Sequence, residues 1–223
     1  MGPLVAMCAV IGALGALIVG VRALQARNIV GSEFGRKLVH AGMGTIAVPF
    51  PWIFADSRPV WYLAAVSIVI LGVIRFVPAI ARKFGTVLGG VDRVSLGDVF
   101  FPLGLASAFT LAHGDKAVFV AATGVLAFGD TAGALVGVRW GRARYSIAGN
   151  TKSIEGSTAV LVFSFLCVTL AFVILGTTSL SVAVTGGLGV GLVAALIEAV
   201  SSYGLDNFLL PIAVVELMRH WAV

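Results

Sequence analysis

Charged side chains are scarce in this 223-residue sequence, at 11% of all residues. A water-soluble domain carries about 25%, so this chain has too few polar residues to cover a surface that faces water. Cysteine is also rare: Cys8 and Cys167 both lie in apolar runs and lack the spacing of metal ligands. The composition therefore excludes a soluble globular domain, and both thiols are expected to pack as small apolar side chains.

Long apolar runs take the place of the missing charges, and 59% of all residues are hydrophobic. The runs cover roughly 2–24, 37–54, 60–80, 98–112, 117–138, 158–176 and 181–203. Because about 20 apolar residues in a helix cross a bilayer, they predict seven transmembrane helices, the fourth entering at a tilt or only partway. A shorter run over about 207–219 leaves an eighth span open. The alternating segments of a membrane β-barrel are not seen, so the predicted fold is all-α, a polytopic membrane helix bundle.

One integral membrane domain over 1–223 is the expected organisation, because neither an internal repeat nor a low-complexity tail is visible. The first apolar run lacks the basic flank of a signal peptide and is long for one. Residues 1–24 are therefore interpreted as a retained N-terminal helix.

Lysine and arginine indicate the orientation, since cytoplasmic loops are enriched in both. With the N-terminus outside, twelve of them fall on the inner side. These twelve are Arg22, Arg27, Arg36, Lys37, Arg75, Arg82, Lys83, Arg93, Arg139, Arg142, Arg144 and Lys152. The outer side keeps Arg58, Lys116 and, if the eighth run crosses, Arg219. The bias predicts an outer N-terminus and cytoplasmic loops over 25–36, 81–97 and 139–157.

Four polar clusters share the inner side, namely 34–40, 93–98, 139–157 and 201–207. We therefore expect the functional site at the cytoplasmic face, which in a prokaryote is the inner face of the cell membrane. The net charge of +5 suits loops that meet anionic lipid headgroups or a phosphorylated substrate. Basic residues scattered among short loops argue against nucleic acid as a partner.

Asp130 is a carboxylate inside an apolar run, where a charge is costly unless it is paired or functional. Gly129, Gly133 and Gly137 flank it at helical spacing and form a stripe on which another helix can pack closely. Asp130 either pairs with an arginine for structural reasons, or faces a water-filled cavity open to the cytoplasm and binds a metal or a proton. The second interpretation is favoured.

The segment 139–157 combines cations, glycines and small hydroxyl residues ahead of an apolar run. Its polar residues are Arg139, Arg142, Arg144, Lys152, Ser153, Glu155 and Ser157, with glycines at Gly141, Gly149 and Gly156. Arginine forks around phosphate oxygens, and glycine lets backbone N–H groups approach an anion. A helix that starts near Ser157 would add its positive end, so the segment suggests a polyphosphate cradle; membrane anchoring by positive charge is the alternative.

Arg36, Lys37 and His40 lie within one turn at the start of the second predicted helix and could contact one anion together. Interface anchoring is the alternative for the two cations, and a buried structural histidine is the alternative for His40. Further hard oxygen ligands lie near helix ends, at Asp98, Glu198, Asp206 and Asn207. Mg²⁺ takes one or two carboxylates together with substrate phosphates, so these residues and Asp130 are candidate metal ligands.

Taken in order, RKLVHAG (36–42), GDTAGALVGVRWG (129–141), NTKSIEGS (150–157) and IEAVSSYGLDNFLLP (197–211) resemble the polyprenol kinase family, which includes phytol and dolichol kinases. The likeness covers a core over 36–212. It implies transfer of the γ-phosphate of CTP to an isoprenoid alcohol in the bilayer, with Mg²⁺ as cofactor. The short chain favours phytol or geranylgeraniol over dolichol, and the oligomeric state is left open.

The residue patterns and the resemblance together suggest roles. Asp130, Lys152, Glu155 and Asp206 are the expected catalytic residues, and Asp98, Asp130, Glu198, Asp206 and Asn207 the expected metal ligands. The expected nucleotide-binding residues are Arg36, Lys37, His40, Arg139, Arg142, Lys152, Ser153, Gly156 and Ser157.

Two other functions stay open. A CTP-dependent cytidylyltransferase that makes a CDP-lipid would use a similar pocket but attack the α-phosphate, although its usual His-Gly-Gly-type signature is not found. A transporter would use Asp130 and Glu198 as proton or cation sites, but it predicts polar residues near mid-membrane rather than at one face.

Overall fold

The structure is a computed structural model that describes residues 2–89, 96–147, 149–176 and 178–221. Its helices are α1 (Pro3–Ala26), α2 (Ser32–Ala47), α3 (Phe50–Ile53), α4 (Arg58–Phe76), α5 (Pro78–Gly89), α6 (Gly97–Leu111), α7 (Lys116–Gly124), the π-helix η1 (Val125–Gly129), α8 (Asp130–Trp140), α9 (Ile154–Leu175), α10 (Leu180–Val200) and α11 (Asp206–Trp221). The strands β1 (Arg144–Ile147) and β2 (Asn150–Ser153) form an antiparallel hairpin. Arg93 and the side chain of Lys83, both predicted to be cytoplasmic, lie outside the described part.

The predicted helical membrane fold is confirmed in its main feature. Five helical segments are long and apolar enough to cross a membrane: α1, α4, the continuous α7–η1–α8, α9 and α10. The remaining runs also fold as helices, but α2, α6 and α11 have 16, 15 and 16 residues. The chain is therefore a multi-pass membrane protein by length and composition, and seven or eight crossings with an outer N-terminus stay a prediction.

Two predicted loops contain regular structure. The first part of the expected loop 81–97 continues α5, whose mixed apolar and basic composition hid a helix from a search for apolar runs. In the second loop, 139–157, the hairpin pairs Arg144 with Ser153 and Ile147 with Asn150. Ser153, the last residue of the hairpin, is the N-cap of α9, and its Oγ accepts a hydrogen bond from the backbone N–H of Gly156 at 3.1 Å. The helix α9 therefore starts at Ile154 rather than near Ser157.

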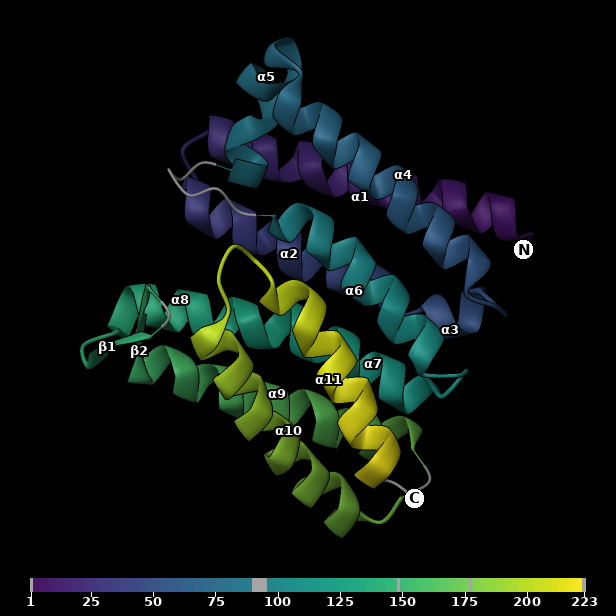
Figure 1. The fold of residues 1–223 in the computed structure, drawn as a ribbon. Coiled ribbons are helices and arrows are strands. Elements are labelled where there is room, and N and C mark those ends of the chain that lie inside the picture. The colour runs from purple at the N-terminus through teal and green to yellow at the C-terminus, as the bar shows by residue number, and fades with distance from the viewer. Residues whose placement is uncertain (1, 90–95, 148, 177, 222–223) are drawn as a thin grey trace.

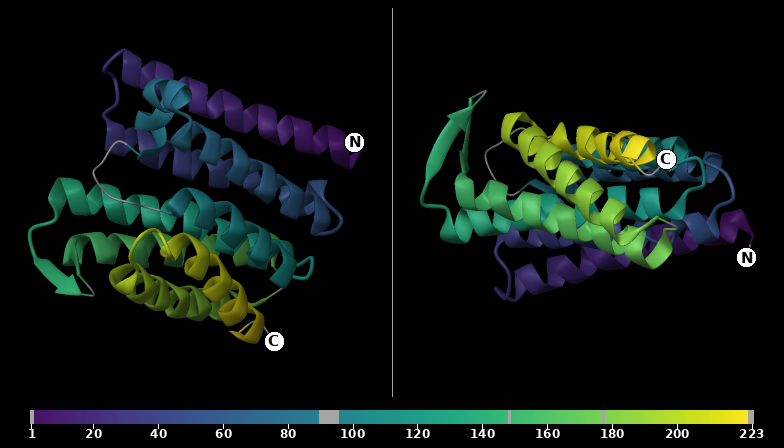
Figure 2. Two further views of the ribbon diagram at one scale, coloured as in Figure 1. Left: turned by 45° about the horizontal axis from the view of Figure 1, so that its top comes forward. Right: turned by 90° about the horizontal axis from the view of Figure 1, so that it is seen from below.

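The segment α7–η1–α8 forms the centre of the bundle (Figure 1). The most apolar window of this segment is 72% buried, against 22% for α1 and for α4. α2 and α6 lie on one side of it, with α1 and α4 beyond them, and α9 and α10 lie on the other, as Figure 2 also shows; α11 packs against α6, α7 and α10. A side chain on this segment therefore meets other helices rather than lipid.

The glycine stripe around Asp130 packs closely on α9, as predicted. A Cβ added at Gly133 would lie 2.3 Å from Cγ2 of Val160, which no real side chain tolerates. At Gly129 it would lie 2.7 Å from Oγ of Ser164. Small residues thus bring α8 and α9 into close contact and fix the rotation that turns Asp130 away from α9.

Candidate active site

Asp130 follows the π-helix η1 directly, and this irregular turn helps to build its surroundings. A π-helical turn shifts the backbone hydrogen bonds by one residue, so a carbonyl in it can accept from a side chain instead. The carbonyl of Leu126 does so, lying 2.9 Å from Nε2 of His40 on α2. Close approach of α2 depends on Gly44, where an added Cβ would lie 2.2 Å from Cβ of Ala127.

Lys37 and His40, one turn apart on α2, both contact the Asp130 carboxylate. Nζ of Lys37 donates to Oδ2 at 2.7 Å, and Nε2 of His40 lies 3.2 Å from the same oxygen. Because Leu126 and Asp130 both offer acceptors to Nε2, that nitrogen carries the proton. The lysine and aspartate side chains are only 4% and 10% exposed, so the charge of Asp130 is balanced inside the protein.

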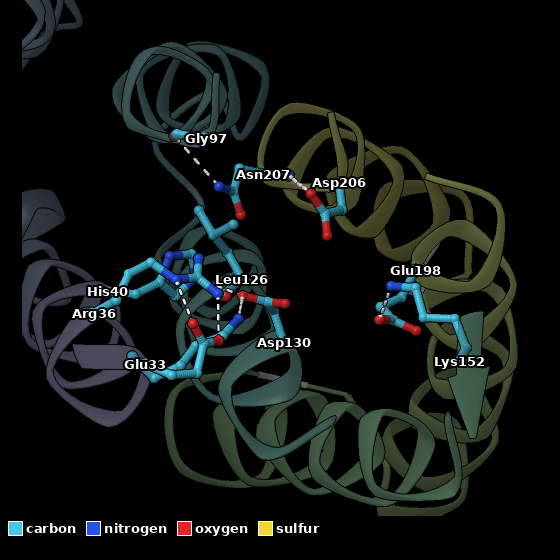
Figure 3. Close-up of polar contacts among 11 residues, drawn as sticks. Glu33, Arg36, His40, Gly97, Leu126, Asp130, Lys152, Glu198, Asp206 and Asn207 are labelled. Atoms are coloured by element: carbon cyan, nitrogen blue, oxygen red, sulfur yellow. Dashed lines mark hydrogen bonds and ion pairs between the residues drawn. The ribbon is translucent and has the colours of Figure 1, made fainter. Parts of the chain in front are cut away.

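A second ion pair lies across from the first one (Figure 3). Lys152 on β2 contacts Glu198 on α10, where Glu198 is buried. The hairpin that carries Lys152 is held to the end of α10 by Asn150, whose side-chain amide donates to Oγ of Ser202 at 2.6 Å and to the carbonyl of Ser201 at 3.3 Å.

Asp206, the first residue of α11, is the carboxylate between the two pairs (Figure 3). It feels the charges of Asp130, Lys37, Lys152 and Glu198, so α2, α8, β2 and α10 all come close to the start of α11. Within the described part of the chain Asp206 makes no ion pair, and its Oδ1 accepts only from the backbone N–H of Asn207 at 3.1 Å. Burial, with the nearby Asp130 charge, raises the pKa of this carboxyl to about 6.

Several predicted residues lie beside this centre rather than in it. Arg36 pairs with Glu33 at 2.6 Å, so it does not share a partner with Lys37 and His40. Asp98 lies 3.5 Å from Arg75 on α4. Asn207 is buried and donates from its side chain to the carbonyl of Gly97 at 3.3 Å, which ties α11 to α6.

The segment 139–157 has two parts with different roles. Arg139, Arg142 and Arg144 are exposed to solvent. Oε1 of Glu155 accepts from the backbone N–H groups of Arg142 and Ala143, both at 3.1 Å, and thereby holds the start of the hairpin against α9. Ser157 shares a hydrogen bond of 2.6 Å with the hydroxyl of Tyr145. Gly156 meets Gly133, since an added Cβ would lie 2.9 Å from its carbonyl oxygen. Of the predicted cradle, Lys152 is the side chain that the structure brings to the centre.

The acidic residues offer a partial set of metal ligands. Among the described residues no group of three or more His, Cys, Asp or Glu side chains could by itself hold a metal ion. Asp206 has no cationic partner there and faces Asp130 and Glu198, both already paired with lysines. This donor set fits Mg²⁺, which keeps several waters and takes most of its remaining ligands from substrate phosphates.

Comparisons with known proteins agree with the motifs. No family model matches the chain, and no solved structure matches it. A phytol kinase of Synechocystis sp. is 32% identical over 203 residues, which cover 89% of this chain and 84% of that protein. An identity at this level over nearly the whole of both chains shows that this protein belongs to the polyprenol kinase family.

Proposed function

We propose that this protein is a kinase that transfers the γ-phosphate of CTP to the hydroxyl group of an isoprenoid alcohol at the cytoplasmic face of the membrane. The kinase named in the comparison acts on phytol, and a similar alcohol is the proposed acceptor. The observation that carries the proposal is the group of five charged side chains, Lys37, Asp130, Lys152, Glu198 and Asp206, gathered inside an otherwise apolar bundle.

The position of this group suits both substrates. Lys152 is on the hairpin that follows the exposed arginines of 139–144, so a polyphosphate can approach from water. The alcohol dissolves in the bilayer and brings only its hydroxyl to the polar end. The predicted orientation, with most cations inside, puts this end at the cytoplasm, where CTP is available.

Each charged group has a defined part in phosphoryl transfer. The reaction needs the reactants held in line and the developing charge neutralised, rather than covalent help from the protein. Lys152 can exchange Glu198 for a phosphate oxygen, and the Lys37–Asp130 pair can orient the attacking hydroxyl. Asp206 and Asp130 would hold Mg²⁺, which supplies positive charge to the phosphates when bound.

The test uses purified protein in liposomes with Mg²⁺, phytol or geranylgeraniol, and CTP labelled at either the α or the γ phosphorus. Label from the γ position in a lipid monophosphate is the expected result. Label from the α position in a lipid, with phosphatidate also tried as acceptor, would instead show a cytidylyltransferase. No transfer from either position, across several alcohols, would contradict both enzymes and return the transporter to consideration.

A further inference from the structure

A mostly apolar cavity lies on the side of His40 away from Asp130. It is bounded by α1, α2, α3, α4 and α6 and encloses about 450 Å³ including its open mouth. Ser67 is the one polar residue among those that line it.

The cavity and the charged group share a wall. The ring of His40, which contacts Asp130 on one side, meets the ring of Phe101 edge-on at a centroid distance of 4.8 Å. Phe101 lines the cavity, as does Met43, one turn beyond His40 on α2. One end of the cavity therefore lies next to His40, which contacts Asp130.

From this wall the cavity extends toward the opposite end of the helices. The residues of α4 that line it run from Leu71 to Val60, a rise of about 16 Å. The far end is closed by Phe50, which is 3% exposed and packs against Phe54 and Phe119. The cavity is thus apolar, runs along the helices and is closed by Phe50 at the end away from the charges.

We propose that this cavity holds the hydrocarbon tail of the isoprenoid alcohol, with the hydroxyl passing His40 and Phe101 to reach Lys37 and Asp130. The inference rests on the proposed function and adds a tail site to it. A polar ligand is excluded, because its donors and acceptors would be buried without partners. A hydrocarbon chain matches the apolar lining, and the neighbouring His40 and Asp130 match its polar end.

The same geometry makes the cavity a selector of chain length. Ala47 and Ala64 are buried in its wall, where small side chains leave room for the ligand. Phe50 and Val60 set the depth, so the cavity cannot take the whole tail of an alcohol that is longer than the cavity. A larger side chain at Ala64 would shorten the space available to the tail without reaching the charged group.

The first experiment compares Ala64→Leu with Ala65→Leu. Ala65 is the next residue on α4 and is exposed. Its substitution by leucine therefore adds the same volume to the same helix, but outside the cavity. The acceptors are phytol and geraniol, which has half as many carbons. Ala64→Leu should lower kcat/KM for phytol by about 10- to 100-fold, the range set by a misfit of one or a few methylenes in an apolar pocket. Its kcat/KM for geraniol, its KM for CTP and all constants of Ala65→Leu should stay at wild-type values. Equal losses on both alcohols, or no loss on phytol, would overturn the tail site.

A binding experiment separates the tail site from the proposed reaction. Wild-type protein in liposomes is irradiated with a phytol analogue that carries a diazirine at the end of its tail, and the labelled peptides are mapped. Labels near Phe50 and Val60, lost in Ala64→Leu and kept in Ala65→Leu, would support the cavity even if no phosphate is transferred. Labels confined to lipid-facing residues such as Val69 would overturn it even if the protein is an active kinase.

Discussion

The charged group contains two ion pairs between a lysine and a carboxylate, Lys37–Asp130 and Lys152–Glu198, which differ in how deeply they are buried. Lys37 and Asp130 are both on helices and are 4% and 10% exposed, and His40 adds a further contact to the carboxylate. Lys152 is on a short hairpin and is 23% exposed, while its partner Glu198 is 10% exposed. One pair lies in the best packed part of the bundle, and the other has a lysine that reaches water.

This difference separates a fixed element from an exchangeable one. Removing one partner of a buried pair leaves an uncompensated charge and is strongly destabilising, so Lys37 and Asp130 must stay together. A partly exposed lysine such as Lys152 loses less when it changes partner, since water and phosphate can both replace the carboxylate. We expect the first pair to act on the alcohol without moving, and Lys152 to turn from Glu198 to the nucleotide.

The largest effect is expected from Asp130→Asn. The substitution removes the charge that Lys37 and His40 share, and turnover with CTP and phytol should fall at least about 10²- to 10³-fold, the usual loss for a group that acts on the transition state. Labelled γ-phosphate in lipid measures turnover, and gel filtration checks that the protein stays folded. Asp56→Asn is the control and should have normal activity, because Asp56 is exposed in the loop that precedes α4. Near-normal turnover of Asp130→Asn would remove it from the site.

The next effect is on nucleotide binding. Lys152→Ala should raise KM for CTP about 10- to 100-fold, as expected for loss of a hydrogen bond to a charged group, with KM for the alcohol unchanged. Lys116→Ala is the control, because Lys116 lies over the ring of Trp52, far from this pair along the chain.

Glu198 left alone could itself disturb the site, so the pair is also changed together. Lys152→Met with Glu198→Gln removes both charges and keeps the shapes close to the original. If KM for CTP stays raised in this double variant, the lysine contacts the nucleotide. Recovery of normal kinetics would mean that the pair is only a structural contact between the hairpin and α10.

The apolar helices and much of the charged centre could be predicted from the sequence. Long apolar runs indicate the helices, and charged residues within or beside those runs indicate the centre. Asp130, Lys152, Glu198 and Asp206 stand out as charges next to apolar runs, and the structure brings them together. The glycines at 129 and 133 predicted the close contact with α9 for the same reason, since spacing on a helix is visible without a structure.

Features that depend on packing between distant segments could not be predicted. Lys37 and Asp130 are 93 residues apart, and only the rotation of α2 against the π-turn brings them together. The cavity is lined by ordinary apolar residues from five helices, with no pattern to mark them. The hairpin places Lys152 at the centre, whereas Arg139 and Arg142, which precede the hairpin, are exposed. The positive charge of these residues does not indicate which of them reaches the centre.

A smaller effect is expected at His40, which positions Asp130 rather than carrying the reaction. His40→Asn removes the contact between the ring and Asp130, and kcat should fall up to about tenfold, in line with one ordinary hydrogen bond. KM for CTP should not change, because the proposed nucleotide contact is Lys152 in the opposite pair. A rise in KM for CTP with unchanged kcat would place His40 on the nucleotide instead, as the sequence first suggested, and would weaken the division between the two pairs.

The smallest effect is expected where the hairpin is held. Asn150→Ala deletes the two hydrogen bonds to Ser201 and Ser202, so the hairpin that carries Lys152 loses its link to the end of α10. Because Lys152 itself is kept, KM for CTP should rise only a few-fold, about the value of one or two neutral hydrogen bonds, with kcat unchanged. Thr151→Ala is the control, because Thr151 is the next residue of the same strand and is exposed. If Lys152 only exchanges partners, its hairpin affects the binding of CTP and not the transfer of phosphate. A loss of kcat in Asn150→Ala would therefore mean that the hairpin also positions the alcohol, and that the two ion pairs act as one unit.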